Sequence, residues 1–112
     1  MRILNLTPHK INVFNENGER VRVLLPYGIV ARVSVKNKLV KTEDRIPYYV
    51  QETGKVQGLM KPQEDVIYVV STLVRTSLPE RTDLASPGEL IRDDDGQPIG
   101  CKGLVFNRKV IE

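Results

Sequence analysis

Two dipeptides constrain the fold of this chain most strongly, because each stands between segments that read as β-strands. Asn17-Gly18 and Asp95-Gly96 favour tight hairpin turns, since both residues of each pair tolerate a positive φ angle. Residues 19–25 follow the first turn, and residues 89–92 and 97–106 flank the second. The sequence therefore predicts a fold built largely from hairpins.

The strand predicted over residues 19–25 alternates polar and apolar side chains. Because successive side chains of a strand point to opposite faces, Val21 and Val23 are expected to face the core. Arg20 and Arg22 are expected to face water.

A second alternating segment follows the turn at Pro26-Tyr27-Gly28. Its spacing predicts that Ala31, Val33 and Val35 share one face of a strand. The charged residues 37–45 come next, and they are expected to form a loop.

Another hairpin is predicted over residues 46–59. Its strands are expected at residues 46–50 and 55–59, which flank the segment Glu52-Thr53-Gly54. Glycine is frequent in turns because it adopts a positive φ angle without a steric penalty, so Gly54 is expected at the turn.

Residues 66–70 form the most apolar run of the chain, which is typical of a central strand buried on both faces. Ser71 can cap a short helix over residues 72–78, and Pro79 ends it. Residues 80–88 are expected to form a loop.

These expectations describe a single β-rich domain over residues 1–112. The fold class is mainly β, with an antiparallel or mixed sheet, or a partly closed barrel of hairpins, and one short helix. A chain of 112 residues with 40% apolar residues can bury one core without disulfides.

The chain has one cysteine, Cys101, so it forms no internal disulfide, and Cys101 is expected to be a buried, inert thiol. The N-terminal apolar stretch is interrupted at Asn5 and stopped by Pro8, too early for a secretion signal. No segment approaches the ~20 apolar residues of a membrane helix. We therefore expect a cytoplasmic protein that does not enter a membrane.

No catalytic, metal or cofactor motif stands out. The single histidine, His9, is expected in a loop, because it lacks the partners of a metal site or a catalytic triad. The segment Asp93-Asp94-Asp95-Gly96 reads as a solvated turn, since an apolar strand replaces the later ligands of a calcium loop. The glycines match neither a phosphate-binding loop nor a dinucleotide fingerprint.

The net charge of +3 is unevenly distributed. Residues 1–56 hold ten Lys/Arg and five Asp/Glu, a net charge of +5, whereas residues 57–112 hold seven and nine, a net charge of −2. A basic half is compatible with an anionic partner, although an ordinary solvated surface has a similar composition.

Arginines near turns are the leading candidates for ligand binding, because the guanidinium group matches phosphate oxygens bidentately. The predicted ligand-binding residues are Tyr27, Arg32, Ser71, Arg75, Arg81, Asp83 and Arg92. In this hypothesis the arginines hold phosphates, Tyr27 stacks on a base, and Ser71 or Asp83 reads polar edges. The alternative is structural: Arg81 pairs with Asp83, and Arg92 pairs with the aspartates that follow it.

Several short motifs appear in a characteristic order along nearly the whole chain. They are Asn5-Leu6-Thr7-Pro8-His9, Pro26-x-Gly28-x-x-Ala31-Arg32-Val33, Ile67-Tyr68-Val69-Val70-Ser71-x-x-Val74, Arg81-x-Asp83-Leu84, Pro87-Gly88 and Arg92-Asp93-x-x-Gly96-x-x-x-Gly100-Cys101. This order resembles a group of small, uncharacterised proteins from phages, prophages and bacteria. The resemblance implies a phage or mobile-element context.

In kind, the chain is also similar to the phage sponge proteins that sequester cyclic nucleotide signals of CBASS and Thoeris immunity. That similarity implies a non-catalytic homo-oligomer that captures a small cyclic nucleotide in the host cytoplasm. It is an analogy between classes of protein and not a motif match.

Three other functions remain open. A phage structural or assembly protein, or a module that binds a host protein, predicts an exposed apolar patch or sheet edge and no enclosed Arg-lined cavity. A weak nucleic-acid binder, which ranks lower, predicts a continuous basic stripe and binding that falls steeply with salt. A phosphodiesterase is disfavoured because only His9 is available as a histidine base.

Overall fold

Both dipeptide turns form hairpins in the computed structural model, which describes residues 1–108. Gly18 and Gly96 have φ angles of 82° and 80°, as these tight turns require. The elements are β1 (Arg2–Asn5), β2 (Ile11–Phe14), β3 (Arg20–Leu24), β4 (Arg32–Glu43), β5 (Ile46–Gln57), β6 (Val66–Val69), α1 (Thr72–Ser77), β7 (Leu84–Arg92) and β8 (Pro98–Phe106). The predicted strand-rich fold with one short helix is confirmed.

Six strands form a mixed sheet in the order β1-β6-β7-β8-β2-β3. The pairs β1–β6, β6–β7 and β2–β8 are parallel, whereas β2–β3 and β7–β8 are antiparallel. Beyond β3, Pro26 forms a bridge to Asn5 at the end of β1. The sheet therefore curls into a nearly closed barrel, which we call the body (residues 1–31 and 58–108).

Strand β6 is the predicted central strand, and both of its faces are buried. Tyr68 and Val70 belong to one core cluster, with Leu6, Val74 and Leu84. Val69, on the opposite face, packs in a second cluster with Ile11, Val13, Leu24 and Cys101. The continuous apolar run is explained by this two-sided burial.

Helix α1 begins as predicted at Ser71, whose Oγ accepts a hydrogen bond from the backbone N–H of Val74 at 3.2 Å. Val74 is the buried residue of the helix and joins it to the core. Pro79 follows shortly after the last turn and cannot continue the helix.

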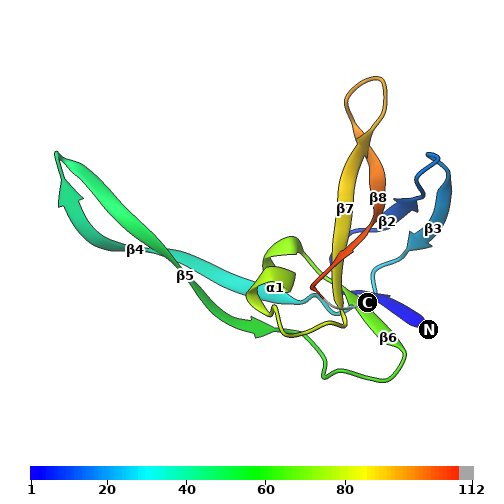
Figure 1. The fold of residues 1–112 in the computed structure, drawn as a ribbon, viewed down its shortest axis with the longest axis horizontal. Coiled ribbons are helices and arrows are strands. Elements are labelled where there is room, and N and C mark those ends of the chain that lie inside the picture. Colours follow the sequence, from blue (N-terminus) through cyan, green and yellow to red (C-terminus); the bar gives the residue numbers. More distant parts are fainter. Residues whose placement is uncertain (109–112) are drawn as a thin grey trace.

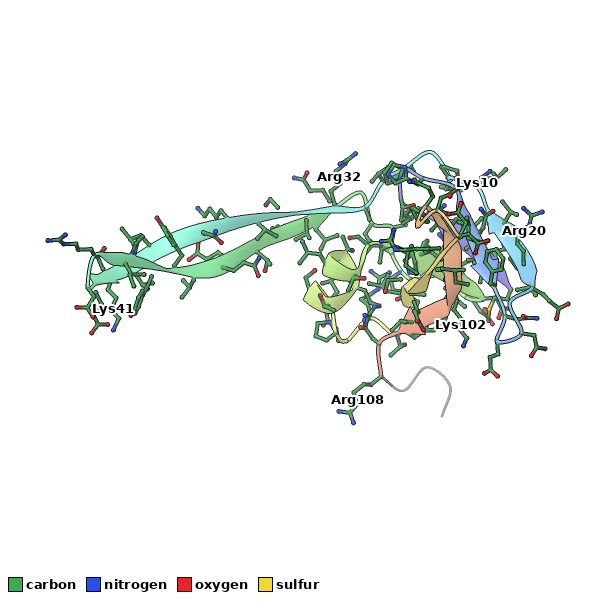
Figure 2. All side chains as sticks on the ribbon, turned by 90° about the horizontal axis from the view of Figure 1, so that it is seen from above. Lys10, Arg20, Arg32, Lys41, Lys102 and Arg108 are labelled. Atoms are coloured by element: carbon green, nitrogen blue, oxygen red, sulfur yellow. The ribbon has the colours of Figure 1, made fainter. Side chains whose placement is uncertain are left out.

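Strands β4 and β5 form a separate two-stranded sheet, which we call the arm (residues 32–57). Figure 1 shows the arm reaching far out from the body, and the molecule measures 52 × 40 × 31 Å. Figure 2 places Lys41 near the tip of the arm and Arg20 at the opposite end of the body.

The arm corrects two sequence predictions. Residues 37–45 are not a loop, because β4 continues to Glu43 and the turn lies at Asp44 and Arg45, both with positive φ angles. Gly54 is not at a turn, since β5 runs through it opposite Ser34. Nearly all of β4 is exposed on both faces, so its charged side chains keep their contact with water.

Two further predictions are wrong in the body. Val21 and Val23 face outward, with 52% and 40% of their surface exposed, because Leu24 is the residue of β3 that enters the core and alternate side chains point to the opposite face. Residues 80–88 are not all loop, because β7 begins at Leu84. Gly88 allows this, since a Cβ there would overlap the backbone carbonyl of Lys102 on β8.

Candidate functional site

The seven predicted ligand-binding residues lie in several separate places. Arg75, Arg81, Asp83 and Arg92 bind other parts of the chain, and Tyr27 lies on the outside of the body. Only Arg32 and Ser71 line a common cleft.

Arg75 connects the helix to the body. Its Nε donates to Ser86 Oγ at 2.8 Å and its Nη1 donates to Asn107 Oδ1 at 3.1 Å. Asn107 in turn donates through Nδ2 to the carbonyls of Leu78 at 3.0 Å and Arg81 at 2.9 Å. These carbonyls belong to the end of α1 and the loop after it, so Arg75 and Asn107 stabilise the helix and its C-terminal loop.

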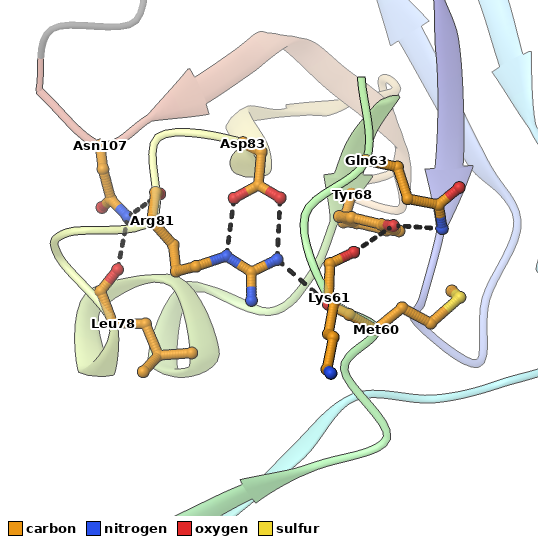
Figure 3. Close-up of polar contacts among 8 residues, drawn as sticks. All are labelled: Met60, Lys61, Gln63, Tyr68, Leu78, Arg81, Asp83 and Asn107. Atoms are coloured by element: carbon orange, nitrogen blue, oxygen red, sulfur yellow. Dashed lines mark hydrogen bonds and ion pairs between the residues drawn. The ribbon is translucent and has the colours of Figure 1, made fainter. Parts of the chain in front are cut away.

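Arg81 and Asp83 form the ion pair of the structural alternative (Figure 3). Arg81 Nε and Nη2 donate to the two carboxylate oxygens of Asp83, both at 2.8 Å. The same Nη2 donates to the carbonyl of Met60 at 3.2 Å. The hydrogen bonds to Asp83 raise the pKa of the Arg81 guanidinium above its usual value. This bidentate pair fastens the chain that leaves the arm.

Tyr68 holds the segment that leaves the arm one residue further on, at Lys61. Its hydroxyl donates to the carbonyl of Lys61 at 3.0 Å and accepts a hydrogen bond from Gln63 Nε2 at 2.9 Å (Figure 3). Since the ring of Tyr68 is fully buried, this part of the arm's root is fixed to the core.

Arg92 and Asp93 shape the β7–β8 turn. Arg92 Nη1 donates to the carbonyl of Gly96 at 2.8 Å, and Asp93 Oδ1 accepts from the backbone N–H groups of Asp95 and Gln97, both at 2.9 Å. Arg92 thus binds a turn carbonyl, and no ion pair to the aspartates appears in residues 1–108.

Tyr27 is 47% exposed, and its backbone N–H donates to the carbonyl of Asn5 at 2.9 Å. His9 lies in the loop between β1 and β2, as predicted, and its carbonyl accepts a hydrogen bond from Asn5 Nδ2 at 2.8 Å. Cys101 is buried as predicted, and burial raises the pKa of its thiol. An inert thiol is consistent with that environment.

A cleft of about 500 Å³ lies where the arm joins the body. The lining residues are Pro8, Val30, Ala31, Arg32, Val33, Ser34, Lys55, Gln57, Ser71 and Leu73. They come from the β1–β2 loop, the root of the arm and the start of α1. The volume lies within the range of small-molecule sites.

The cleft is basic. Arg32 is paired across the arm with Gln57, and Lys55 lies in a bulge where the β4–β5 register shifts. The lining contains no carboxylate. Neither Arg32 nor Lys55 forms an ion pair within residues 1–108, so both cations are available to an anion.

The neutral polar groups of the cleft can form hydrogen bonds with an anionic ligand that has donors and acceptors besides its charged group. Ser71 Oγ accepts one bond as the helix cap, and a hydroxyl retains one donor and one more acceptor. Ser34 and Gln57 add neutral polar groups, and Leu73 adds an apolar wall.

Sequence reasoning missed Lys55 and the arm itself. Lys36 and Lys38 alternate with Val35, Asn37 and Leu39, which is a strand pattern, but the density of charge favoured a loop. The bulge that places Lys55 in the cleft could not be predicted from the alternation of polar and apolar residues.

Two general features of the described residues bear on the kind of site. Residues 1–108 contain no group of three or more His, Cys, Asp or Glu side chains that could hold a metal ion. Within the same range, no helix has the length and apolar character needed to cross a membrane.

Comparison of the chain with protein-family models, curated proteins and solved structures finds no match.

Proposed function

We propose that this protein is a non-catalytic binding protein that captures a small anionic ligand, a cyclic nucleotide, in the cleft at the root of the arm. The observation that carries the proposal is the convergence of Arg32 and Lys55 on a cleft whose lining has no carboxylate. Two such cations favour an anionic ligand over a neutral one.

Each lining residue has a definite part in this proposal. Arg32 binds one phosphate through its planar fork of donors, and Lys55 neutralises a second phosphate as a point charge. Ser71 donates its hydroxyl proton to a polar edge of the ligand. Leu73 and Val33 contact the apolar surface of a sugar or base.

The class of ligand comes from the resemblance to phage proteins and the analogy with sponges. Capture of an immune signal needs tight binding but no chemical reaction. No bond of the ligand is therefore cleaved. Of the predicted ligand residues, only Arg32 and Ser71 remain in the proposed site, because Arg75, Arg81 and Arg92 are held in contacts elsewhere.

Calorimetry of the full chain against a panel of cyclic di- and trinucleotides tests the proposal. We expect Arg32→Gln and Lys55→Gln each to weaken binding about tenfold or more, since hydrogen bonds to charged groups contribute about 1.5–3 kcal/mol. Lys38→Gln is the matched control, because Lys38 lies on the arm and does not line the cleft. Chromatography of the released ligand should recover it intact.

No heat from any member of the panel at high micromolar concentration would sink the proposal. Equal weakening by Lys38→Gln would also contradict it, because the effect would then come from net charge and not from the cleft.

A second candidate function is a structural or host-protein-binding module without a small ligand. The exposed apolar residues of the arm favour it, among them Leu39 at 54% and Tyr49 at 55%. A silent calorimetric panel, combined with arm-dependent association with another protein, would support this candidate over nucleotide capture.

A further inference from the structure

Among the paired residues of the arm, one side carries no charge. In an antiparallel ribbon, residues paired across the two strands point to the same side, and neighbouring pairs alternate. The pairs on one side, the uncharged side, are Val33–Val56, Val35–Thr53, Asn37–Gln51, Leu39–Tyr49 and Thr42–Pro47. The charged residues in the remaining pairs are Arg32, Lys36, Lys38, Lys41, Glu43 and Glu52.

Contacts within the arm agree with this division. Lys41 Nζ lies 3.0 Å from a carboxylate oxygen of Glu43, and Lys38 Nζ lies 3.9 Å from one of Glu52. Lys41 also lies over the ring of Tyr48 at 5.5 Å. On the charged side, Lys38 and Lys41 are thus paired with carboxylates of the arm itself.

The uncharged side starts as part of the core and then continues into solvent. Val33 and Val56 pack against the core cluster at the root. Further out, Val35 is 36% exposed, and Leu39 and Tyr49 are more than half exposed. An isolated two-stranded ribbon is marginally stable in water, and both outer edges of this one are unpaired within residues 1–108.

The body exposes a second apolar surface, which we call the strip. It follows the edge strand β3 and the segment after it, with exposures between 40% and 68%. The strip consists of Val21, Val23, Leu25, Tyr27 and Ile29. From Arg20 to Val23 the outer edge of β3 has no partner in the described residues.

The tip of the arm and the start of β3 lie toward opposite ends of the molecule. Figure 2 shows this in the positions of Lys41, near the tip of the arm, and Arg20, at the start of β3. The outer part of the arm therefore does not reach β3 of its own chain.

Charge also distinguishes the two ends. Residues 32–57 hold six Lys/Arg and three Asp/Glu, and the rest of the chain holds eleven of each, so the arm accounts for the whole net charge of +3. The turns of the β2–β3 and β7–β8 hairpins carry the acidic residues Glu16, Glu19, Asp93, Asp94 and Asp95. Glu16 also lines one hollow with Glu89 of β7 and Lys102 of β8.

We propose that the arm of one molecule docks on the strip of a second copy of this chain. The uncharged side of the arm packs face to face on the apolar strip, so that apolar surface on both is removed from water. The basic arm then lies beside the acidic hairpin ends of its neighbour. Because two different surfaces meet, the contact is head-to-tail, and it builds a ring or a filament.

Sedimentation and light scattering across a range of concentrations test the docking. The wild-type chain is expected to exceed its monomer mass of 12.7 kDa as concentration rises. Leu39→Thr with Tyr49→Thr retains strand-forming residues and is expected to weaken association about 100-fold, at roughly tenfold for each contact. Val105→Thr, at a 44% exposed site on β8, is the matched control and is expected to associate as wild type does.

Mixing two defective variants distinguishes this contact from others. The arm variant retains its strip, and Val21→Thr with Leu25→Thr retains its arm, so each alone should remain monomeric. Their mixture can form one arm–strip contact and is expected to give a species of twice the chain mass. Circular dichroism of each variant confirms that it is folded.

Three results would overturn the proposal. They are a wild-type chain that stays monomeric at several hundred micromolar, a strip variant that still associates, and a mixture that forms no dimer. None of them bears on nucleotide capture, because Arg32 and Lys55 are unchanged in these variants and the calorimetric panel is measured separately.

Discussion

The body and the arm consist of similar strands but are stabilised in different ways. In the body, apolar side chains such as Tyr68 and Leu84 are enclosed, and a polar residue at the same depth, Asn5, has hydrogen-bond partners. In the arm, Leu39 and Tyr49 remain exposed, and the strands are paired only with each other. The body therefore provides the free energy of folding, and the arm presents surface that the fold itself does not use.

The connection between the two regions is firmly anchored. Arg81 binds the carbonyl of Met60, and Tyr68 binds that of Lys61, so the chain leaving the arm is fixed to the core. Gly58 has a φ angle of 81°, and a Cβ there would overlap the carbonyl of Val30 on the chain that enters the arm. The segment that enters the arm and the segment that leaves it are thus held close together at the root. This close approach directs the arm away from the body.

Truncation of matched leucines gives the largest expected difference between the regions. Leu84 is fully buried, so Leu84→Ala should lower the free energy of unfolding by about 2–5 kcal/mol. Leu39→Ala removes a 54% exposed side chain and should cost less than about 1 kcal/mol. Urea denaturation at low protein concentration, where copies do not associate, measures both. Equal losses would show that the arm contributes to the core.

Replacement of an asparagine in the body and of one in the arm should give the next largest difference in the free energy of unfolding. Asn5 Nδ2 donates to the carbonyls of His9 and Leu24 at 2.8 and 2.9 Å, and Asn5 Oδ1 accepts from the backbone N–H and the hydroxyl of Thr7. Asn5→Ala removes all four hydrogen bonds, of which the one to Leu24 is buried, and should cost about 2–3 kcal/mol.

Asn37→Ala is the control for that change, because Asn37 is an exposed residue of the arm. Its free energy of unfolding should stay within about 0.5 kcal/mol of wild type. Chemical denaturation compares the two, and a cost for Asn37→Ala close to that of Asn5→Ala would contradict the division between body and arm.

Glycines test how closely each region is packed. Gly88→Ala in β7 directs a methyl group at the backbone carbonyls of Lys102 and Gly103, which cannot move without shifting β8, so a loss of about 1–3 kcal/mol is expected. Gly54→Ala in the arm meets the hydroxyl of Ser34, which can rotate away, and should change stability by less than about 0.5 kcal/mol. Thermal unfolding of both variants distinguishes a rigid contact from an adaptable one.

The sequence predicted the elements whose signal is local. Asn17-Gly18 and Asp95-Gly96 are at the turns, Ser71 caps the helix, and residues 66–70 are central, because turn geometry, capping and continuous burial depend on neighbouring residues. The same reasoning failed for the arm, since it assumed that a strand must bury one face. The charged strand β4 contradicts that assumption.

The candidate site was less predictable than the fold, because it depends on contacts distant in sequence. Arg81 and Asp83 are two residues apart, and the structural alternative for them was already evident from the sequence. Arg75, by contrast, is held by Ser86 and Asn107, and no pattern near Arg75 indicates these partners. A long arginine near a turn can reach either a ligand or its own fold, and only the packed structure distinguishes the two.

Removal of the outer arm should have a small effect on stability and a clear effect on self-association. Replacing residues 36–52 by Asn-Gly retains the Val35–Thr53 pair and the cleft residues Arg32 and Lys55. The free energy of unfolding should change by less than about 1 kcal/mol, because the deleted residues bury almost nothing against the body and a shorter connection costs less entropy to close.

The shortened chain should bind the cyclic nucleotide as tightly as wild type in calorimetry, and it should sediment as a monomer at every concentration. A chain that fails to fold would show that the arm stabilises the body and would invalidate the comparison drawn above. Loss of nucleotide binding in a folded, monomeric variant would instead mean that capture needs the assembled form, with the cleft completed by the arm or strip of a neighbouring copy.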